Sequence, residues 1–271
     1  MNELILPNGQ KLFYIDKLTA LDSYDEIYND NDYLKHGIKV KEGDVIFDVG
    51  ANIGLFSRFI AQQAQNLKIF TFEPVPAIFE VLEANLAEIK AEVKNYNIGL
   101  GELTEKIEIN YYPRVSADSA IIPFDYDLKV NRYVENYKET ICKAVPIARL
   151  VPRFLRKRLV KSVINRLYKK EIATCQIRPL SEIIKENNIN RIDFLKIDAE
   201  NYESQVLAGI LDNDWKKINQ ISMEVHEHIK GGEGLLNRIN KILESKNFNT
   251  VLEKEGRFAK MGVFMLYATK N

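Results

Sequence analysis

The sequence predicts one α/β domain built around a largely parallel β-sheet, and two repeating patterns carry this prediction. Short apolar runs rich in β-branched residues, of which 45–49 and 192–197 are the clearest, are typical of strands buried on both faces. Between such runs, as in 77–89, apolar residues recur at the spacing of a helix with one buried face. The last two predicted strands, 248–252 and 263–268, have no helix between them and resemble a closing hairpin. This order of elements is typical of a sheet with helices on both faces.

Length and composition limit the class of protein. A chain of 271 residues is long enough for one sizeable domain and short for two, so we expect 1–271 to form a single domain. A formal net charge of zero gives no general attraction to nucleic acid, and we expect no nucleic-acid partner. Only two cysteines, Cys142 and Cys175, favour a reducing compartment, although the two could pair. We find no signal peptide and no apolar run of the roughly 18 residues that a membrane span needs, so we expect a cytoplasmic protein.

The first 40 residues, 1–40, are expected to form a hairpin and a lid. Residues 4–15 contain Asn8-Gly9, a dipeptide that favours the tight turn of a β-hairpin. The acidic, tyrosine-rich segment 22–33 comes before the first core strand, and we therefore expect it to cover a ligand site.

The first core strand, 45–49, leads through a glycine turn into a predicted helix, and this connection is the first candidate site. Gly50 and Gly54 bound the turn, and glycine allows both left-handed backbone angles and close approach of a ligand. A helix that begins here presents free N–H groups and the positive end of its dipole, which favour an anionic group. We expect Asp48, Gly50, Asn52 and Gly54 to bind a cofactor; the simpler interpretation is a plain strand–turn–helix connection.

The residues of this turn favour S-adenosylmethionine over a dinucleotide. A dinucleotide site has the pattern G-x-G-x-x-G, but no glycine stands between Gly50 and Gly54. Asp48 would also repel a pyrophosphate, whereas a ligand with one carboxylate, one ammonium and one sulfonium suits an acid beside a helix start. The next predicted strand, 68–73, ends in Glu73, and an acid at this offset accepts hydrogen bonds from ribose hydroxyls.

Three short blocks of the chain resemble one known family. The blocks are Asp48-Val49-Gly50-Ala51-Asn52-Ile53-Gly54, Phe72-Glu73-Pro74 and Phe194-Leu195-Lys196-Ile197-Asp198-Ala199-Glu200-Asn201-Tyr202-Glu203. Together they resemble the FkbM-type family of S-adenosylmethionine-dependent methyltransferases. The resemblance implies a Rossmann-like, seven-stranded class I methyltransferase sheet. Two features depart from the family pattern: Asn201 stands where glycine is usual, and the stretch 125–173 looks inserted.

The resemblance also implies roles for residues outside these blocks. It places the end of the predicted strand 93–98 beside the adenine, so Asn97 and Ile98 are expected to contact the cofactor. Asn97 is equally well explained by a role in its own turn. Family members often bring an aromatic residue of the lid near the cofactor, and Tyr33 is the candidate here. The loop 116–119 resembles a serine-containing loop near the family's active site.

Acids and histidines gather where two later strands are predicted to end. The strand 192–197 ends at Asp198, and the strand 219–225 contains Glu224 and runs into His226. In open α/β sheets, ligands bind at the carboxyl ends of the strands. We therefore expect Asp198 to contact the cofactor and all three residues to take part in catalysis.

Methyl transfer to a hydroxyl requires a group that removes the hydroxyl proton, and a neutral histidine suits this task at pH 7. We expect His226 to be this base, oriented by Glu224 or Asp198. His228 shares its face only if the strand continues. Exposed loop positions are the simpler interpretation for both histidines.

The same residues also allow a metal-assisted alternative. Asp198, Glu224 and His226 would offer oxygen and nitrogen ligands to Mg²⁺ or Mn²⁺, which would lower the pKa of the acceptor hydroxyl. We expect the metal-free mechanism, and a divalent metal stays open as a second cofactor. Lys196 is expected to form an ion pair with Glu200 or Glu224.

The inserted segment 125–173 follows a further predicted strand, 106–112, and is the most basic part of the chain. Its helix, predicted over 149–170 with about five turns, has apolar residues every four positions. Its basic residues, with no acid between them, are Arg149, Arg153, Arg156, Lys157, Arg158, Lys161, Arg166, Lys169 and Lys170. Three interpretations compete: a packed cap helix with a solvated basic face, docking of an acidic acyl or peptidyl carrier protein, and contact with an anionic membrane surface. We do not expect a membrane partner.

The leading hypothesis for function is an O-methyltransferase that acts in natural-product biosynthesis. Its acceptor would be a hydroxyl of a small molecule, a sugar, or a carrier-tethered polyketide or peptide intermediate. The alternatives are a nucleotide-dependent oxidoreductase and a non-catalytic module that binds S-adenosylmethionine or docks on a partner.

Overall fold

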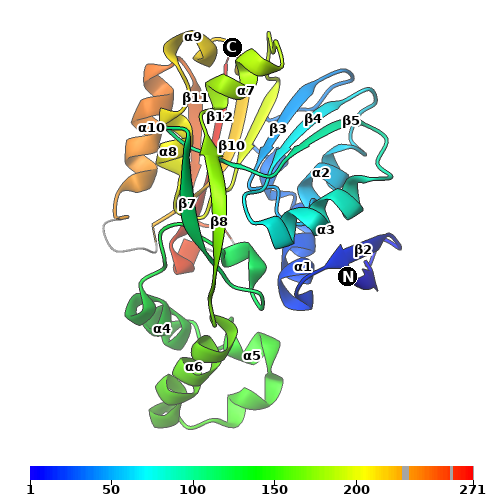
Figure 1. Cartoon of the computed structure of the whole chain (residues 1–271). Coiled ribbons are helices and arrows are strands. Elements are labelled where there is room, and N and C mark those ends of the chain that lie inside the picture. Colours follow the sequence, from blue (N-terminus) through cyan, green and yellow to red (C-terminus); the bar gives the residue numbers. More distant parts are fainter. Residues whose placement is uncertain (228–231, 257–258, 271) are drawn as a thin grey trace.

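A seven-stranded sheet forms the centre of the computed structural model, which describes residues 1–227, 232–256 and 259–270 (Figure 1). The strand order is β11-β12-β10-β9-β3-β4-β5. β12 runs antiparallel to β10 and β11, and all other neighbours are parallel. The strands are β3 (Val45–Val49), β4 (Lys68–Phe72), β5 (Glu92–Tyr96), β9 (Phe194–Ile197), β10 (Gln220–His226), β11 (Asn249–Glu253) and β12 (Val263–Thr269). The predicted seven-stranded α/β sheet is therefore confirmed, and each strand overlaps a run predicted from the sequence.

Helices cover both faces of this sheet because successive residues of a buried strand point to opposite sides. Ile46 and Phe194 belong to the core on one face, whereas their neighbours Phe47 and Leu195 belong to the core on the other. The first face is covered by α2 (Leu55–Ile60) and α3 (Pro76–Leu86). The second is covered by α7 (Leu180–Glu186), α8 (Glu203–Ala208), α9 (Asp212–Trp215) and α10 (Leu235–Ser245).

The N-terminal segment forms the predicted hairpin and then crosses the first face. β1 (Asn2–Ile5) and β2 (Lys11–Tyr14) pair antiparallel around the turn at Gly9, whose φ is +82°. The hairpin is tied to α3 because the Asn85 side chain accepts a hydrogen bond from the Phe13 N–H and donates to the Phe13 carbonyl. Three helical segments follow: α1 (Lys17–Tyr24), a π-helical turn (Asp25–Asn29) and a 3₁₀ turn (Asp32–Leu34). They bring Tyr33 to the carboxyl edge of the sheet.

A second, three-stranded sheet forms an arm beside the central one (Figure 1). β7 (Glu105–Tyr111) and β8 (Glu171–Arg178) pair antiparallel along seven residues, and β6 (Gly99–Leu100) joins the free side of β8. The sequence did not predict β8, because the inserted segment was expected to extend to 173 and the sheet to resume only after Cys175. Along β8 only Cys175 and Ile177 are buried, and this alternation is too short to identify a strand from the sequence.

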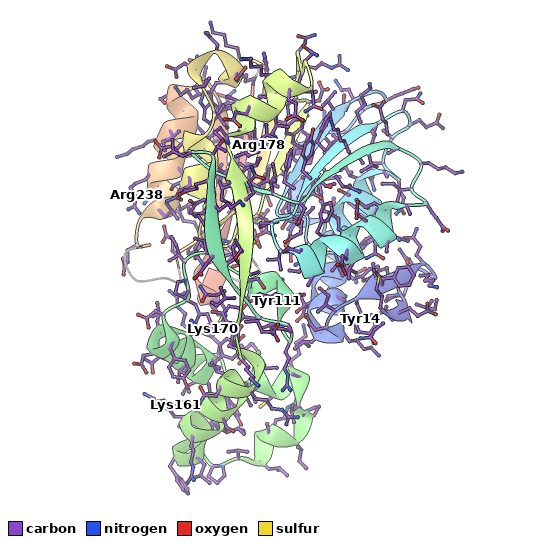
Figure 2. The ribbon with its side chains drawn as sticks, viewed as in Figure 1. Tyr14, Tyr111, Lys161, Lys170, Arg178 and Arg238 are labelled. Carbon is purple, nitrogen blue, oxygen red and sulfur yellow. The ribbon has the colours of Figure 1, made fainter. Side chains whose placement is uncertain are left out.

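The inserted segment is a helical unit at the end of this arm. It contains α4 (Tyr126–Glu135), α5 (Ile141–Ala144), a 3₁₀ turn (Pro146–Leu150) and α6 (Arg153–Leu167). α6 has 15 residues, about four turns, and is therefore shorter than the predicted helix. Lys161 on α6 and Lys170 beyond its end mark the course of the basic stretch in Figure 2. The unit has a small core of its own, made of Val130, Tyr137, Ile141, Cys142, Ala148, Val160 and Ile164.

The two cysteines lie in different cores, and both are free and buried. Cys142 belongs to the core of the inserted unit, and Cys175, on β8, packs with the α2–α3 face of the sheet. Burial raises the pKa of the Cys175 thiol to about 12, so this side chain stays protonated. Within the described ranges, we find no helix with the length and apolar character needed to span a bilayer.

Candidate active site

The glycine turn after β3 packs directly against the end of β9. Gly50 has a φ of +71°, and a Cβ atom at this position would lie 1.7 Å from the carbonyl oxygen of Asp198. At Gly54, where φ is +85°, a Cβ atom would lie 2.9 Å from Leu82 Cδ1. Both glycines are therefore required by the backbone and by its neighbours. Gly50 brings the ends of β3 and β9 together.

The N–H groups of this turn already have acceptors inside the protein. All five, from Gly50 to Gly54, donate hydrogen bonds within the turn or to the end of β4. The Asn52 N–H, for example, donates to Glu73 Oε2 at 3.0 Å. The expected anion site at the start of the helix therefore does not involve these five N–H groups, and for the first turn of α2 it stays a prediction. What the turn offers a ligand is close approach to the backbone at Gly50.

Glu73 lies at the base of the pocket and is buried. Its Oε2 accepts from Asn52, and its Oε1 accepts from the Val75 N–H at 2.9 Å. Burial raises the pKa of Glu73 to about 7, although the two N–H donors and Lys196 oppose this shift. Each carboxylate oxygen keeps a second lone pair for a ligand hydroxyl.

The predicted adenine contacts, Asn97 and Ile98, are held by the protein itself. Asn97 Nδ2 donates to the carbonyl oxygens of Glu73 and Pro74, at 2.9 and 3.2 Å. Ile98 is buried in the core on the second face of the sheet. The turn-stabilising interpretation of Asn97 accounts for these bonds, and contact of either residue with a cofactor stays a prediction.

A pocket that opens to solvent lies at the carboxyl ends of β3, β4 and β9. The serine-containing loop predicted to lie near the site does line it, and the Ser116 N–H and Oγ both donate to Asp16 of the N-terminal segment, at 3.0 and 2.9 Å. The polar and backbone groups that define the pocket come from Gly50, Glu73, Gly99, Ser116, Ser119, Asp198 and Glu200.

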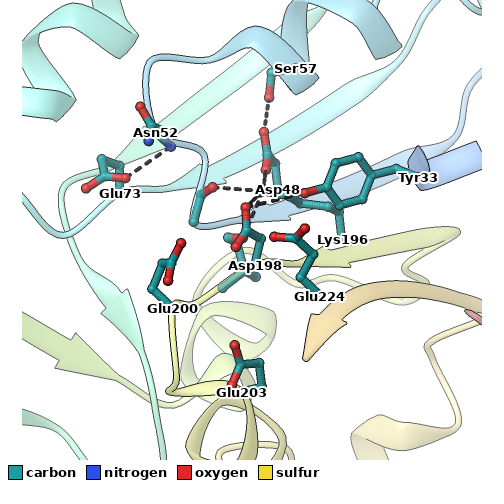
Figure 3. A network of polar contacts seen from close by, with 12 residues as sticks. Tyr33, Asp48, Asn52, Ser57, Glu73, Lys196, Asp198, Glu200, Glu203 and Glu224 are labelled. Atoms are coloured by element: carbon teal, nitrogen blue, oxygen red, sulfur yellow. Dashed lines mark hydrogen bonds and ion pairs between the residues drawn. The ribbon is translucent and has the colours of Figure 1, made fainter. Parts of the chain in front are cut away.

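Behind the turn, a buried lysine ties β3 to β9 (Figure 3). Lys196 Nζ lies 3.2 Å from Asp48 Oδ1 and 3.6 Å from Asp198 Oδ2, and it donates to the Gly50 carbonyl at 2.8 Å. Asp48 also accepts from Ser57 Oγ at 2.7 Å. The expected ion pair of Lys196 with Glu200 or Glu224 is therefore wrong. Asp48 is fully buried and braces the turn, and its predicted contact with a cofactor stays a prediction.

The structure brings the three predicted catalytic residues together. One ligand atom from each of Asp198, Glu224 and His226 lies within 4.8 Å of the other two. Tyr33, the aromatic residue expected from the lid, donates its hydroxyl to Asp198 Oδ2 at 3.4 Å. Asp198 Oδ1 is buried, and no described residue donates a hydrogen bond to it. This cluster borders the pocket at Asp198 and Glu200.

His226 is oriented by Glu203 and not by the two acids expected from the sequence. Its Nδ1 lies 2.5 Å from Glu203 Oε1, and Glu203 is completely buried. Its Nε2 faces Glu200 Oε2 at 3.6 Å and Glu224 Oε2 at 3.7 Å. These last two distances are too long for hydrogen bonds. Nε2 is therefore the atom that His226 turns toward the acid cluster.

The excess of buried acids changes the protonation of the whole cluster. Burial raises the pKa of Glu200 to about 8, with His226 opposing the shift. Burial, together with the charges of Glu26 and Asp198, raises the pKa of Glu224 well above its usual value. Burial alone would lower the pKa of His226, but Glu200, Glu203 and Glu224 outweigh it and raise the pKa well above the usual range. In the ligand-free protein these acids therefore favour the protonated form of His226, and the expected neutral base stays a prediction for the cofactor-bound enzyme.

The loop between β9 and α8 explains the unusual residue in the third sequence block. Glu200 and Asn201 have φ values of +42° and +72°, in the left-handed region that glycine adopts most easily and that asparagine tolerates best among the other residues.

Sequence patterns missed two members of the site: Glu203 as the partner of His226, and Glu26, which reaches the cluster from the N-terminal segment. Burial, with Asp198 and Asp32, raises the pKa of Glu26 to about 7. His228 lies outside the described residues.

Comparison with known proteins agrees with this geometry. The profile of one family, described as the methyltransferase FkbM domain, matches residues 48–250. This chain belongs to the FkbM methyltransferase family. Its S-adenosylmethionine dependence follows from that family, and the Gly50–Glu73–Asp198 pocket is where the cofactor is expected.

The relatives of this FkbM-family chain include free-standing enzymes and part of a larger one. It is 31% identical over 256 residues to the 31-O-demethyl-FK506 methyltransferase FkbM of Streptomyces tacrolimicus, covering 94% of this chain and 92% of that protein. It is 29% identical over 274 residues to the AMB antimetabolite synthetase AmbE of Pseudomonas aeruginosa, covering 99% of this chain but only 12% of the synthetase. The structure of methyltransferase FkbM from Methylobacillus flagellatus KT has a TM-score of 0.50 at 15% identity, covering 93% of this chain and 52% of that one.

The residues of the pocket fit S-adenosylmethionine in three respects. Gly50 lines the pocket with backbone alone, and Glu73, which also lines it, would present a carboxylate to ribose hydroxyls. Asp198 Oδ1, buried without a described donor, is suited to a cationic or hydrogen-bond-donating part of the ligand. Glu73 and Asp198 would therefore hold the cofactor at its two polar ends.

The raised pKa of Glu73 predicts a pH-dependent affinity for the cofactor. The ionised carboxylate accepts ribose hydroxyls better than the acid, so we expect the Kd of S-adenosylhomocysteine to rise roughly tenfold between about pH 8 and about pH 6. The same pKa shift also affects stability, because Glu73 loses its proton near pH 4.5 in the unfolded chain and near pH 7 in the folded one. The contribution of Glu73 to the free energy of unfolding therefore falls as the pH rises from 4.5 to about 7 and is constant above that.

Calorimetric titration across this pH range measures the first effect. Glu73→Gln is expected to bind more weakly and with a nearly constant Kd. A wild-type Kd that does not change with pH would contradict the contact between Glu73 and the ribose.

Proposed function

We propose that this FkbM-family enzyme transfers a methyl group to a hydroxyl oxygen of a small natural-product intermediate. The observation that carries the proposal is the His226–Glu203 pair, whose Nε2 faces the acid cluster beside the cofactor pocket. An amine is already nucleophilic when neutral, whereas an alcohol needs a group that takes its proton as the new bond forms. The name of the relative from Streptomyces, 31-O-demethyl-FK506 methyltransferase, supports oxygen as the acceptor atom.

The chain's own residues would move one proton and hold two groups in line. S-adenosylmethionine, when bound, supplies a methyl group already activated on a sulfonium. In that transfer, His226 Nε2 would take the proton that the acceptor hydroxyl loses. Glu203 keeps the other ring proton on Nδ1, so that the lone pair of the neutral ring lies on Nε2. Positive charge brought by the cofactor opposes the carboxylates that raise the pKa of His226.

Product analysis tests the choice of acceptor atom. Methyl-labelled S-adenosylmethionine would be incubated with the enzyme and 31-O-demethyl-FK506, and with a panel of sugars and hydroxy acids. We expect the label in a methoxy group, which the carbon NMR shift distinguishes from an N-methyl group. Labelled N-methyl product from an acceptor that carries both groups would contradict the proposal.

Glu203→Gln is expected to slow turnover without weakening cofactor binding. The amide no longer fixes the tautomer of His226, so we expect kcat to fall by about 10²-fold while the KM of the acceptor changes little. The Kd of S-adenosylhomocysteine, measured by calorimetry, should be unchanged. Because Glu203 also accepts from the Asn201 N–H at 3.1 Å, thermal unfolding is the control for folding. An unaltered kcat in a folded variant would remove Glu203 from the mechanism.

A divalent cation at Asp198, Glu224 and His226 is a second candidate, favoured by the convergence of these groups. Mg²⁺ binds its ligands at about 2.1 Å, so two ligand atoms on opposite sides of the ion lie about 4.2 Å apart. The three ligand atoms spread over as much as 4.8 Å and would have to draw together. In that mechanism the cation would lower the pKa of the acceptor hydroxyl, and Nε2 would bind the cation instead of a proton.

Chelation separates the two mechanisms. We expect turnover to survive treatment with a chelator and to gain nothing from added Mg²⁺ or Mn²⁺, because His226 takes the proton directly. Loss of turnover on chelation, with recovery on adding back one metal, would contradict this expectation and establish the cation site.

The two other hypotheses are weaker. Membership of a methyltransferase family leaves the oxidoreductase interpretation without support, and a cofactor titration with NAD⁺ would show no binding. A non-catalytic module would bind S-adenosylhomocysteine without turnover on any acceptor. The cluster borders the pocket through Asp198 and Glu200, and turnover on any acceptor would exclude such a module.

A further inference from the structure

Three large apolar side chains protrude from the outer end of the inserted unit. Ile147 is 72% exposed, Leu150 is 80% exposed and Phe154 is 82% exposed. We call these three residues the apolar tip. Single exposed apolar residues are normal on protein surfaces, but these three lie within eight consecutive residues. Ile147 and Leu150 lie in the connection from α5 to α6 and Phe154 in the first turn of α6, and Figure 1 shows this region at the end of the arm remote from the central sheet.

The apolar tip is not needed for the packing of the unit. Ala148, between Ile147 and Leu150, is buried in the unit's core, as are Val160 and Ile164 of α6. In a 3₁₀ helix, residues three apart share a face, so Ile147 and Leu150 point together away from the side on which Ala148 is buried. α6 therefore packs on the unit's core in its later turns, whereas Phe154 in its first turn is exposed.

Basic residues flank the apolar tip along the sequence. Residues 140–170 contain ten lysines and arginines and no aspartate or glutamate. The part of the chain that the structure describes offers no ion pair to any of these ten. Because the whole chain has a formal net charge of zero, the remainder carries an equal excess of acids. The inserted unit is therefore a separate positive region that would attract an anionic surface.

The shape of the apolar tip favours a membrane surface over a folded protein partner. A protein partner is bound through a surface complementary in shape, usually with a groove or pocket for each anchor. Side chains that protrude singly from the end of an arm need only an apolar layer to enter. Full burial of such a side chain contributes roughly 2 kcal/mol, and each basic residue near an anionic surface contributes about 1 kcal/mol. Three apolar and several basic residues are thus enough for reversible binding.

We propose that the apolar tip and the basic residues around it dock this enzyme reversibly on an anionic phospholipid surface. This departs from the expectation, formed from the sequence, that the chain has no membrane partner; the sequence did not reveal that the first turn of the basic helix is exposed. The proposal does not depend on the methyl acceptor, so its test needs no turnover.

Docking would also bear on the cofactor pocket, because the inserted unit is linked to the pocket loop. Lys129 of α4 forms an ion pair with Asp118 at 2.5 Å, and the Tyr168 hydroxyl donates to the same carboxylate. Asp118 belongs to the loop whose Ser116 lines the pocket. An enzyme held at the tip would therefore keep its pocket within one domain's length of the lipid surface.

Sedimentation with vesicles tests the proposal on the whole chain. We expect binding to phosphatidylcholine vesicles that contain phosphatidylserine, little binding to pure phosphatidylcholine, and loss of binding at high salt. Leu150→Ser/Phe154→Ser should weaken binding by at least roughly tenfold. Leu103→Ser/Leu211→Ser removes two side chains that are 63% and 67% exposed elsewhere on the surface and should bind as the wild type does.

Three outcomes would overturn the proposal. The first is no sedimentation of the wild type with phosphatidylserine vesicles, and the second is equal binding by the tip variant and the wild type. The third is a dimer or a carrier-protein complex that forms with the wild type and not with the tip variant, in the absence of any vesicle binding. Thermal unfolding of both double variants shows whether each remains folded.

Discussion

Gly50→Ala is expected to abolish measurable cofactor binding. The new methyl group would lie 1.7 Å from the carbonyl oxygen of Asp198. This contact can be relieved only if the backbone of Asp198 moves, which separates β3 from β9. That separation moves Asp198 and the turn apart, and a displacement of about 1 Å at a site of this kind costs roughly 100-fold in function. Calorimetric titration with S-adenosylhomocysteine measures the loss directly.

Gly9→Ala is the matched control for this variant. Gly9 has nearly the same backbone angle, with a φ of +82°, but a Cβ atom there meets nothing within 4 Å. We therefore expect a loss of stability of about 1 kcal/mol from the left-handed angle alone and an unchanged Kd. Normal cofactor binding by folded Gly50→Ala would show that the pocket does not lie at this turn.

His226→Ala is expected to lower kcat by about 10²- to 10⁴-fold and to leave cofactor binding intact. The variant removes the imidazole ring of His226. Its Nδ1 contacts the buried Glu203, and its Nε2 faces Glu200 and Glu224. His226 does not line the pocket, so the Kd of S-adenosylhomocysteine should change little.

His36→Ala provides the comparison within the same chain. His36 is partly exposed, and its Nε2 lies 3.2 Å from Glu253. We expect normal kcat from this variant once its folding has been checked. Full activity of His226→Ala under the same conditions would place the base elsewhere, and Glu200 would then be the first residue to test.

The central sheet could be predicted because buried parallel strands leave a strong signature. Runs such as Val45–Val49 are apolar on both faces, since each residue packs against helices on one side or the other. Strand β8 left no such signature, because only one face of the arm is buried and its other residues are polar. The helix of the inserted segment was predicted over 149–170 and not 153–167, because the apolar spacing continues through residues that the fold leaves exposed.

The residues of the site were predicted better than their partners. Asp198, Glu224 and His226 follow from the rule that strand ends meet at one edge. The choice of Glu203 over Glu224 as the partner of Nδ1 depends on side-chain directions in the loop after β9, which no sequence spacing encodes. The same holds for Lys196: it turns to Asp48 because β3 and β9 are neighbours in register, with Asp48 opposite Lys196. The protonation of His226 depends in turn on how many acids the fold brings within reach.

Calorimetric titration of the wild type with S-adenosylhomocysteine, with NAD⁺ as the competing candidate, tests the central claim most directly. We predict micromolar binding of S-adenosylhomocysteine, lost in Gly50→Ala and weakened at low pH through Glu73, and no heat from NAD⁺. Binding of NAD⁺ alone, or of neither ligand by a sample shown to be folded, would contradict the assignment of this pocket to S-adenosylmethionine.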